Sequence, residues 1–164
     1  MTTAQTDNLA RLWAARSPRT VVRTPEEAVV LASIVEKETG ASADRGKVAG
    51  VFVNRLRIGM PLQTDPTVIY GLGAAFDGNL RKRDLLAANP YNTYLNSGLP
   101  PTPICLPGRA AIHAALHPAP GNTLYFVARG DGSHQFSETF DEHDAAVSRY
   151  QLRRGSPAPG TSPP

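Results

Sequence analysis

Residues 24–39 read TPEEAVVLASIVEKET, and this stretch decides the fold because it predicts the helix that opens the domain. Thr24 is a typical helix cap, Pro25 suits the first helical turn, and Glu27 stands where it completes a capping box. Apolar residues at helical spacing fill the rest of the stretch. Gly40 follows it and is expected to end the helix in a left-handed conformation.

The patterns that follow predict a mixed fold. Residues 42–59 have apolar positions at helical spacing, which predicts a second helix capped by its first residue, Ser42. Prolines and glycines interrupt residues 60–107, so a long and loop-rich middle is expected. Residues 109–116 predict a short helix, 123–137 a two-stranded hairpin, and 139–150 a last helix that a capping box opens. The fold class is therefore α+β, mostly helical, with a small antiparallel β-hairpin or sheet.

The composition indicates one globular domain. The chain has 164 residues, 41% of them hydrophobic, which is enough to bury a core without disulfides or a structural metal. We place a polar segment at 1–23, the main domain at 24–154 and a disordered tail rich in proline, glycine and serine at 155–164. Neither a signal peptide nor a membrane span is expected in the first segment.

The net charge and the known motifs exclude few classes of function. The net charge of +3 suits any polyanion, so it does not choose among peptidoglycan carboxylates, phospholipid headgroups and nucleic acid. No P-loop, dinucleotide-binding fingerprint or zinc-ligand spacing occurs, so no cofactor and no metal are expected. The single cysteine, Cys105, lacks the context of a nucleophile, and His134 on a predicted strand is expected to pack.

Two glutamates near the end of the first helix have different expected surroundings. On a helical wheel Glu38 falls within the apolar stripe that contains Leu31, Ile34 and Val35, whereas Glu36 points to the opposite side, into water. A carboxyl against apolar groups has a raised pKa and can carry a proton near neutral pH, as a general acid must. Glu38 is the candidate proton donor, although wheel position alone favours a structural carboxylate that caps loop amides or pairs with an arginine.

Several separated motifs strengthen the functional interpretation because together they resemble one family. The chain is similar over residues 27–150 to the endolytic murein transglycosylases, the MltG or YceG-like family. The motifs occur in the family's order: LASIVEKET at 31–39, VFVNRLRIGM at 51–60, LQTDPTVIYG at 62–71, YNTY at 91–94, GLPP at 98–101 and LYFV at 124–127.

The resemblance implies a lysozyme-like catalytic domain and a lytic reaction. The family cleaves the β-1,4 bond between N-acetylmuramic acid and N-acetylglucosamine inside glycan strands, leaves a 1,6-anhydro end and consumes no water. Its catalytic glutamate maps onto Glu38, which acts first as general acid and then as general base. The implied partners are peptidoglycan strands and wall synthases such as penicillin-binding proteins, with no nucleic acid. The parent protein is expected in the bacterial inner membrane facing the periplasm, although this chain lacks the family's transmembrane helix and LysM-like region.

Polar residues in the other motifs are candidate substrate contacts. Gln63, Thr64 and Asp65 precede a proline in an expected turn, where they suit the N-acetyl and hydroxyl groups of a sugar. Asp65 is equally suited to cap a helix that begins at Pro66. If Asp65 lies across a cleft from Glu38, hydrolysis by two carboxylates becomes an alternative.

The remaining candidates lie in the YNTY loop and on the second helix. In this loop Tyr91 and Tyr94 suit stacking on sugar rings, and Asn92 and Thr93 suit hydrogen bonds to their edges; plain packing is the alternative. For Asn54, substrate binding and a structural role are equally expected. Arg55 falls within an apolar stripe, where it needs a carboxylate partner or carbonyls, and a structural ion pair is favoured over substrate binding. A third hypothesis for the whole chain is a non-catalytic glycan-binding or scaffolding module.

Overall fold

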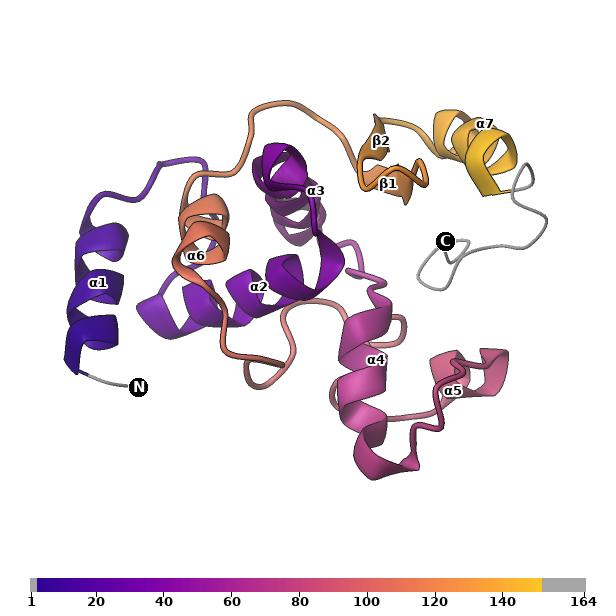
Figure 1. Ribbon diagram of the computed structural model, residues 1–164, viewed down its shortest axis with the longest axis horizontal. Coiled ribbons are helices and arrows are strands. Elements are labelled where there is room, and N and C mark those ends of the chain that lie inside the picture. Colours follow the sequence, from indigo (N-terminus) through magenta and orange to yellow (C-terminus); the bar gives the residue numbers. More distant parts are fainter. Residues whose placement is uncertain (1–2, 152–164) are drawn as a thin grey trace.

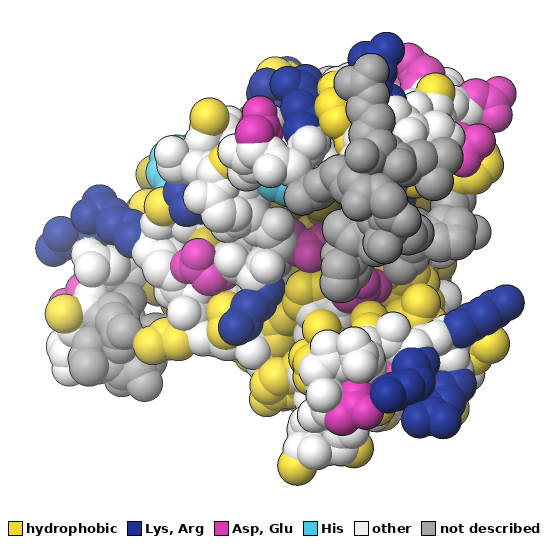
Figure 2. Space-filling model, turned by 45° about the vertical axis from the view of Figure 1, so that its right-hand side comes forward, with side chains coloured by type: hydrophobic (Ala, Val, Ile, Leu, Met, Phe, Trp, Pro, Cys, Tyr) yellow, Lys and Arg dark blue, Asp and Glu magenta, His cyan; other side chains and the backbone are white. Residues whose placement is uncertain are grey.

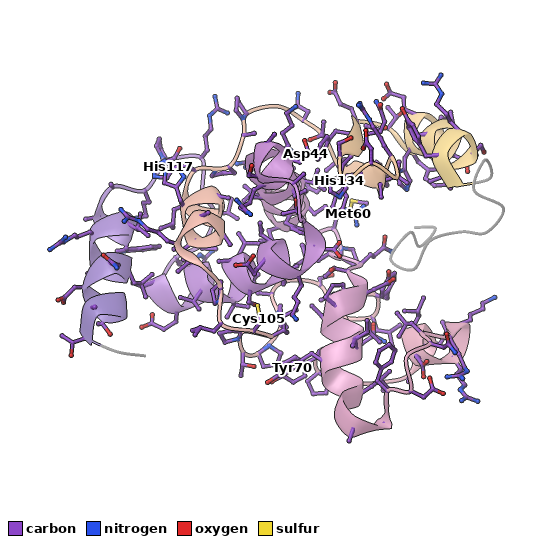
Figure 3. The ribbon with its side chains drawn as sticks, viewed as in Figure 1. Asp44, Met60, Tyr70, Cys105, His117 and His134 are labelled. Carbon is purple, nitrogen blue, oxygen red and sulfur yellow. The ribbon has the colours of Figure 1, made fainter. Side chains whose placement is uncertain are left out.

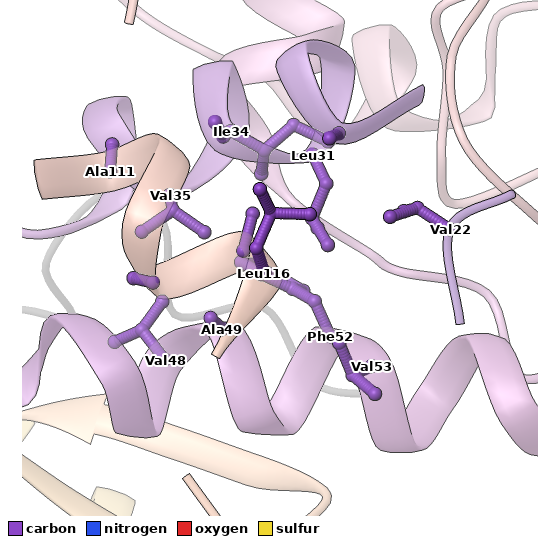
Figure 4. Packing of buried hydrophobic residues seen from close by; sticks show 14 of the residues in the cluster. Val22, Leu31, Ile34, Val35, Val48, Ala49, Phe52, Val53, Ala111 and Leu116 are labelled. Carbon is purple, nitrogen blue, oxygen red and sulfur yellow. The ribbon is translucent and has the colours of Figure 1, made fainter. Parts of the chain in front are cut away.

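The structure is a computed structural model that describes residues 3–151. Helices α2 (Pro25–Glu38), α3 (Arg45–Ile58) and α6 (Arg109–Leu116) build the core, and α6 lies against both of the others (Figure 1). Figure 4 shows how small and branched side chains from the three helices interdigitate around Leu116. All eight residues 28–35 of α2 are buried, because neighbours cover this helix on more than one side. Its burial holds the end of α2 in a fixed place.

The two ends of α2 differ in how well the sequence predicts them. The Thr24 side chain accepts a hydrogen bond from the Glu27 N–H at 3.1 Å, so the predicted cap is confirmed. The Glu27 carboxylate accepts instead from the N–H of Arg23, one residue before the cap, at 2.7 Å. The predicted left-handed stop at Gly40 is wrong, because Thr39 already leaves the helix in an extended conformation (φ −129°, ψ 128°).

Helix α3 begins and ends at well-defined turns. A short 3-10 turn, η1 (Ser42–Asp44), precedes it, so the prediction that Ser42 caps this helix is wrong. The end at Gly59 is as predicted, with a left-handed φ of 75°. Near the middle of α3, the segment that leaves α6 crosses so closely that a Cβ at Gly50 would lie 2.9 Å from the Ala119 carbonyl oxygen.

The middle of the chain contains more helix than its prolines and glycines predict. Helix α4 (Asp65–Leu72), the turn η2 (Gly73–Ala75) and the short helix α5 (Lys82–Leu86) form a lobe at the lower right of Figure 1. Helix α4 contacts α2 on one side and places its first turn close to the end of that helix. The loop-rich prediction for residues 60–107 is therefore only partly right.

The C-terminal part confirms the predicted hairpin and last helix. Strands β1 (Tyr125–Ala128) and β2 (His134–Ser137) pair antiparallel in one two-stranded sheet, which α7 (Phe140–Gln151) covers. Thr139 and Glu142 form the expected capping box, since each backbone N–H donates to the side chain of the other. The hairpin packs on α3 through an edge contact of the Phe52 and Phe126 rings. The α+β fold class is confirmed.

One helix lies where only a polar segment was expected. Helix α1 (Thr3–Ala14) falls within the predicted segment 1–23 and packs against α6 and α2 through Leu12 and Trp13. The Arg16 guanidinium lies over the Trp13 ring, 4.0 Å from its centroid. Among the described helices, none is long and apolar enough to cross a membrane. The predicted tail at 155–164 lies outside the described residues.

Candidate active site

Glu38 is the last residue of α2 and is half-buried where that helix meets the start of α4. Burial raises the pKa of its carboxyl from 4.5 to about 8, and the negative charge of Asp65 acts in the same direction. The nearby Thr64 side chain lowers the same pKa, because a hydroxyl that can donate to the carboxylate favours the ionised form. The balance leaves Glu38 protonated at neutral pH, which suits a general acid.

The neighbouring Glu36 is not in the surroundings that the helical wheel predicts. Its side chain is half-buried, and its Oε1 accepts a hydrogen bond from the Gly108 N–H at 2.7 Å, at the start of α6. The expectation of a Glu36 in water is therefore wrong. The free N–H groups and partial positive charge of a helix N-terminus attract the carboxylate. The two glutamates thus differ in role, since Glu36 ties α2 to α6 and Glu38 faces α4.

Three buried threonines fix the start of α4 relative to the YNTY loop at residues 91–94. Thr93 Oγ1 accepts from the Thr64 N–H at 3.0 Å and lies 2.9 Å from Thr67 Oγ1. The Thr67 hydroxyl also donates to the Thr64 carbonyl at 2.8 Å. Residues 29 positions apart are thereby held together without exposure to solvent. This cluster sets the position of the backbone that lies against Glu38.

Asp65 lies in the first turn of α4, where the helix dipole favours a negative charge. Its side chain is buried, and its carboxylate accepts a hydrogen bond from the Tyr94 hydroxyl. Thr64 rather than Asp65 occupies the cap position of α4, so the capping prediction for Asp65 is wrong by one residue. The second carboxylate of the site is thus close enough to act on Glu38 and is oriented by Tyr94.

Gln63 connects the site to a buried arginine. Its backbone has a left-handed φ of 51°, and its side-chain Oε1 accepts from Arg55 at 3.3 Å. Arg55 is only 6% exposed and donates to the carbonyls of Leu124 at 2.7 Å and Pro61 at 3.0 Å. The favoured ion pair is therefore wrong, because the acceptors that Arg55 bonds among the described residues are carbonyl and amide oxygens. Arg55 joins α3, the residue before β1 and the segment before α4.

The two candidate asparagines use their amides within the protein. Asn92 is fully buried, and its Nδ2 donates to the carbonyls of Leu85 and Ala87 at 3.0 and 2.8 Å. Asn54 Nδ2 donates to the carbonyls of Gly121 and Thr123 at 3.1 and 2.8 Å. These contacts give both side chains a structural role, and substrate binding by them stays a prediction.

Tyr91 brings a residue into the site region that sequence reasoning did not single out. Its ring lies 4.9 Å from that of Tyr70, which is 46% exposed on α4 (Figure 3). The Tyr91 hydroxyl shares a hydrogen bond of 2.8 Å with Thr102. Tyr70 is the ninth residue of the LQTDPTVIYG motif at 62–71, and this membership is the sequence signal that points to it. The pair presents aromatic surface next to polar groups.

His134 and Cys105 have structural contacts. The Asp44 carboxylate accepts from the His134 backbone N–H at 2.8 Å and lies 3.1 Å from its Nδ1, which ties the hairpin to η1 (Figure 3). The Cys105 thiol lies 3.4 Å from the Ser33 carbonyl, and burial raises its pKa, which disfavours the reactive thiolate. Within residues 3–151, no group of three or more histidine, cysteine or acidic side chains is placed to hold a metal.

Figure 2 shows acidic and apolar side chains near one another between the lobe of α4 and α5 and the upper part of the molecule. Basic side chains stand at the outer end of this lobe, where α5 carries Lys82 and Arg83. The neighbouring Arg81 is paired with Asp77 at 2.8 Å. This surface combines apolar and polar groups, as ligand-binding surfaces commonly do.

Comparison with known proteins gives one consistent family. The model of the YceG-like family matches residues 1–149. An endolytic murein transglycosylase of Bacillus subtilis is 48% identical over 122 residues, which cover 74% of this chain and 34% of the relative. One from Streptococcus pneumoniae is 34% identical over 132 residues, covering 77% and 24%. The chain thus spans about a third or less of the length of these curated relatives.

A solved structure supports the same assignment. The 2.6 Å crystal structure of a YceG-like protein from Listeria monocytogenes matches with a TM-score of 0.72 and 38% sequence identity, covering 87% of this chain and 44% of that one. The shared fold therefore extends over nearly all the elements described above. Since the family model also matches almost the whole chain, this protein belongs to the YceG-like family.

Proposed function

We propose that this chain is the catalytic part of an endolytic murein transglycosylase, which cleaves β-1,4 bonds between N-acetylmuramic acid and N-acetylglucosamine inside peptidoglycan strands. The observation that carries the proposal is Glu38, a half-buried carboxyl whose pKa of about 8 keeps it protonated at neutral pH. The family resemblance maps the catalytic glutamate onto the same residue. The names of the curated relatives support peptidoglycan as the substrate.

The proposed reaction uses one protein carboxyl twice. Protonated Glu38 donates to the glycosidic oxygen, and the bond between this oxygen and C1 of the muramic sugar breaks. The Glu38 carboxylate then takes the proton of the C6 hydroxyl as that oxygen bonds to C1 and forms the 1,6-anhydro ring. No water is consumed, and Glu38 ends protonated. A positioned acid and base of this kind accelerates a reaction by about 10² to 10⁴.

The predicted substrate residues divide by their contacts in the structure. We expect direct contacts with sugar from Gln63, Tyr91 and Tyr94, whose side chains are half-buried. We expect Asn54, Asn92 and Thr93 to act by holding the surrounding loops, since their polar groups already bond within the protein. Thr64 and Asp65 act on the carboxyl of Glu38.

Hydrolysis is the second candidate, because Asp65 provides another carboxylate whose charge reaches Glu38. A muramidase needs such a group either to activate water or to attack the sugar. Asp65 is buried and already accepts a hydrogen bond from Tyr94, which favours an electrostatic role over attack on the substrate. The lytic reaction therefore remains the preferred proposal.

Mass spectrometry of digested peptidoglycan tests the proposal. Wild-type protein should release fragments with anhydro-muramic ends, whereas reducing muramic ends would establish the muramidase. Glu38→Gln should abolish both products, and lysis that persists in this variant contradicts the role of Glu38. Glu36→Gln is the matched control, because it changes the neighbouring glutamate while keeping an oxygen for Gly108, and it should retain activity. Binding without any turnover by the wild type would favour the non-catalytic module.

The same proposal extends to the parent protein. We propose that it resides in the bacterial inner membrane with this domain facing the periplasm, where nascent glycan strands are found. Wall synthases such as penicillin-binding proteins are then its proposed partners. Membrane fractionation and crosslinking in cells test this part, and a parent protein recovered only in the cytoplasm would contradict it.

A further inference from the structure

Thr64 has a buried hydroxyl that does not cap the helix at whose start it lies. The residue is 1% exposed and occupies the cap position of α4, yet its side chain makes no capping hydrogen bond. Its Oγ1 has no well-formed hydrogen bond with any residue that the structure describes. A buried hydroxyl that makes no hydrogen bond destabilises the folded state. We therefore expect this hydroxyl to gain a partner during the reaction.

The backbone of Thr64 is fixed on both sides. Its N–H donates to Thr93 Oγ1 at 3.0 Å, and its carbonyl accepts from Thr67 Oγ1 at 2.8 Å and from Thr93 Oγ1 at 3.3 Å. These three buried hydrogen bonds fix the main chain of Thr64 at the start of α4, the helix that contacts α2.

The group beside it is the Glu38 carboxyl, on which the Thr64 side chain acts as a hydrogen-bonding neighbour. We propose that Thr64 is a positioning residue for Glu38, whose hydroxyl donates a hydrogen bond to the Glu38 carboxylate after the proton has passed to the glycosidic oxygen. This inference rests on the proposed function for its catalytic part. Its structural part, a hydrogen bond that forms when Glu38 ionises, does not depend on any substrate.

In this proposal, the adjacent residues Thr64 and Asp65 favour opposite protonation states of the Glu38 carboxyl. The charge of Asp65 helps to hold the proton on Glu38 before reaction, whereas the Thr64 hydroxyl stabilises the carboxylate that remains afterwards. Thr64 keeps its own proton throughout. When the C6 hydroxyl returns a proton to Glu38, the hydrogen bond weakens and the site is restored.

NMR titration of the Glu38 side-chain carboxyl carbon tests the structural part without substrate. Thr64→Val keeps the shape and removes the hydroxyl, so the Glu38 titration midpoint should rise above that of the wild type. Thr64→Ser should return it to the wild-type value. Thr20→Val is the matched control, because it removes a threonine hydroxyl that bonds to the Ala115 carbonyl outside the site, and it should leave the midpoint unchanged.

Kinetics on peptidoglycan test the catalytic part. Thr64→Val should lower kcat by about tenfold to a hundredfold, as expected for a hydrogen bond to a charged group, with little change in KM. The alkaline limb of its pH profile should move to higher pH, and Thr64→Ser should recover most of the rate. A purely structural role would lower the rate without moving this limb.

The outcomes separate this inference from the proposed function. An unchanged or lower Glu38 midpoint in Thr64→Val, or no recovery in Thr64→Ser, overturns the role of Thr64. If Thr64→Val does not fold, Thr64→Ala and Thr64→Ser are compared, and equal midpoints have the same meaning. A raised midpoint in Thr64→Val together with a wild type that does not cleave peptidoglycan supports the hydrogen bond and rejects the function.

Discussion

Replacing Glu38 with glutamine should make the protein less sensitive to pH, because the wild type loses stability through this residue as pH rises from 5 to 7. The folded protein keeps the proton on Glu38 up to about pH 8, whereas the unfolded chain releases it near the ordinary value of 4.5. Between these two values the unfolded state binds fewer protons, so rising pH favours unfolding. Glutamine has no proton to release and should lack this contribution.

The size of the effect follows from the two pKa values. Each pH unit between them corresponds to as much as about 1.4 kcal/mol of unfolding free energy. Over the two units from pH 5 to pH 7, the wild type should therefore lose about 2 to 3 kcal/mol relative to Glu38→Gln. For a domain with a total stability of about 5 to 15 kcal/mol, this difference is readily measured.

Urea unfolding at several pH values provides the assay, since the gap between the two proteins cancels the contributions of all other titrating groups. The free energy of unfolding of Glu38→Gln minus that of the wild type should grow steadily from pH 5 to pH 7 and level off above pH 8. A gap that stays constant over this range would refute the raised pKa, because Glu38 would then titrate alike in the folded and unfolded states.

Two further predictions concern the frame around the site. Gly50→Ala should cost about 1 to 3 kcal/mol of unfolding free energy, because its Cβ would meet the Ala119 carbonyl at 2.9 Å. Gly46→Ala on the same helix meets nothing within 4 Å and should stabilise by up to about 1 kcal/mol, so equal effects in thermal unfolding would contradict the close crossing. Arg55→Met should cost about 3 kcal/mol in urea unfolding because buried carbonyls such as that of Leu124 lose their donor, and a cost below about 1 kcal/mol would contradict this role.

The sequence predicts those elements whose start and stop signals are local. The capped start of α2 at Thr24, the hairpin and the capping box of α7 each depend on residues within a few positions of one another, and each is confirmed. Helix α1 is not predicted because it carries no such signal, and its Leu12 and Trp13 pack against the core only through contacts with helices distant in sequence. Gly40 shows the opposite error, because a local signal is present but is not used. Glycine could end the helix in a left-handed conformation, but Thr39 has already left the helix in an extended one.

In the candidate site too, the sequence predicts local features but not contacts between residues that are distant in the chain. The helical wheel predicts apolar surroundings for Glu38, and burial raises the pKa of this carboxyl. The wheel does not show that Glu36 is held by the start of α6, 72 residues away in sequence. The contacts of Thr64 with Thr93 are similarly distant in the chain and depend on tertiary structure. Motifs therefore indicate candidate residues for the site, and only the fold shows that Thr64 and Asp65 influence the Glu38 carboxyl.

The account depends on Glu38 carrying a proton at neutral pH. Carbon-detected NMR of the wild-type protein, with the Glu38 carboxyl resonance assigned by comparison with Glu38→Gln, measures this directly. We predict a titration midpoint close to 8. A midpoint near 4.5, the ordinary value for a solvated glutamate, would contradict the account.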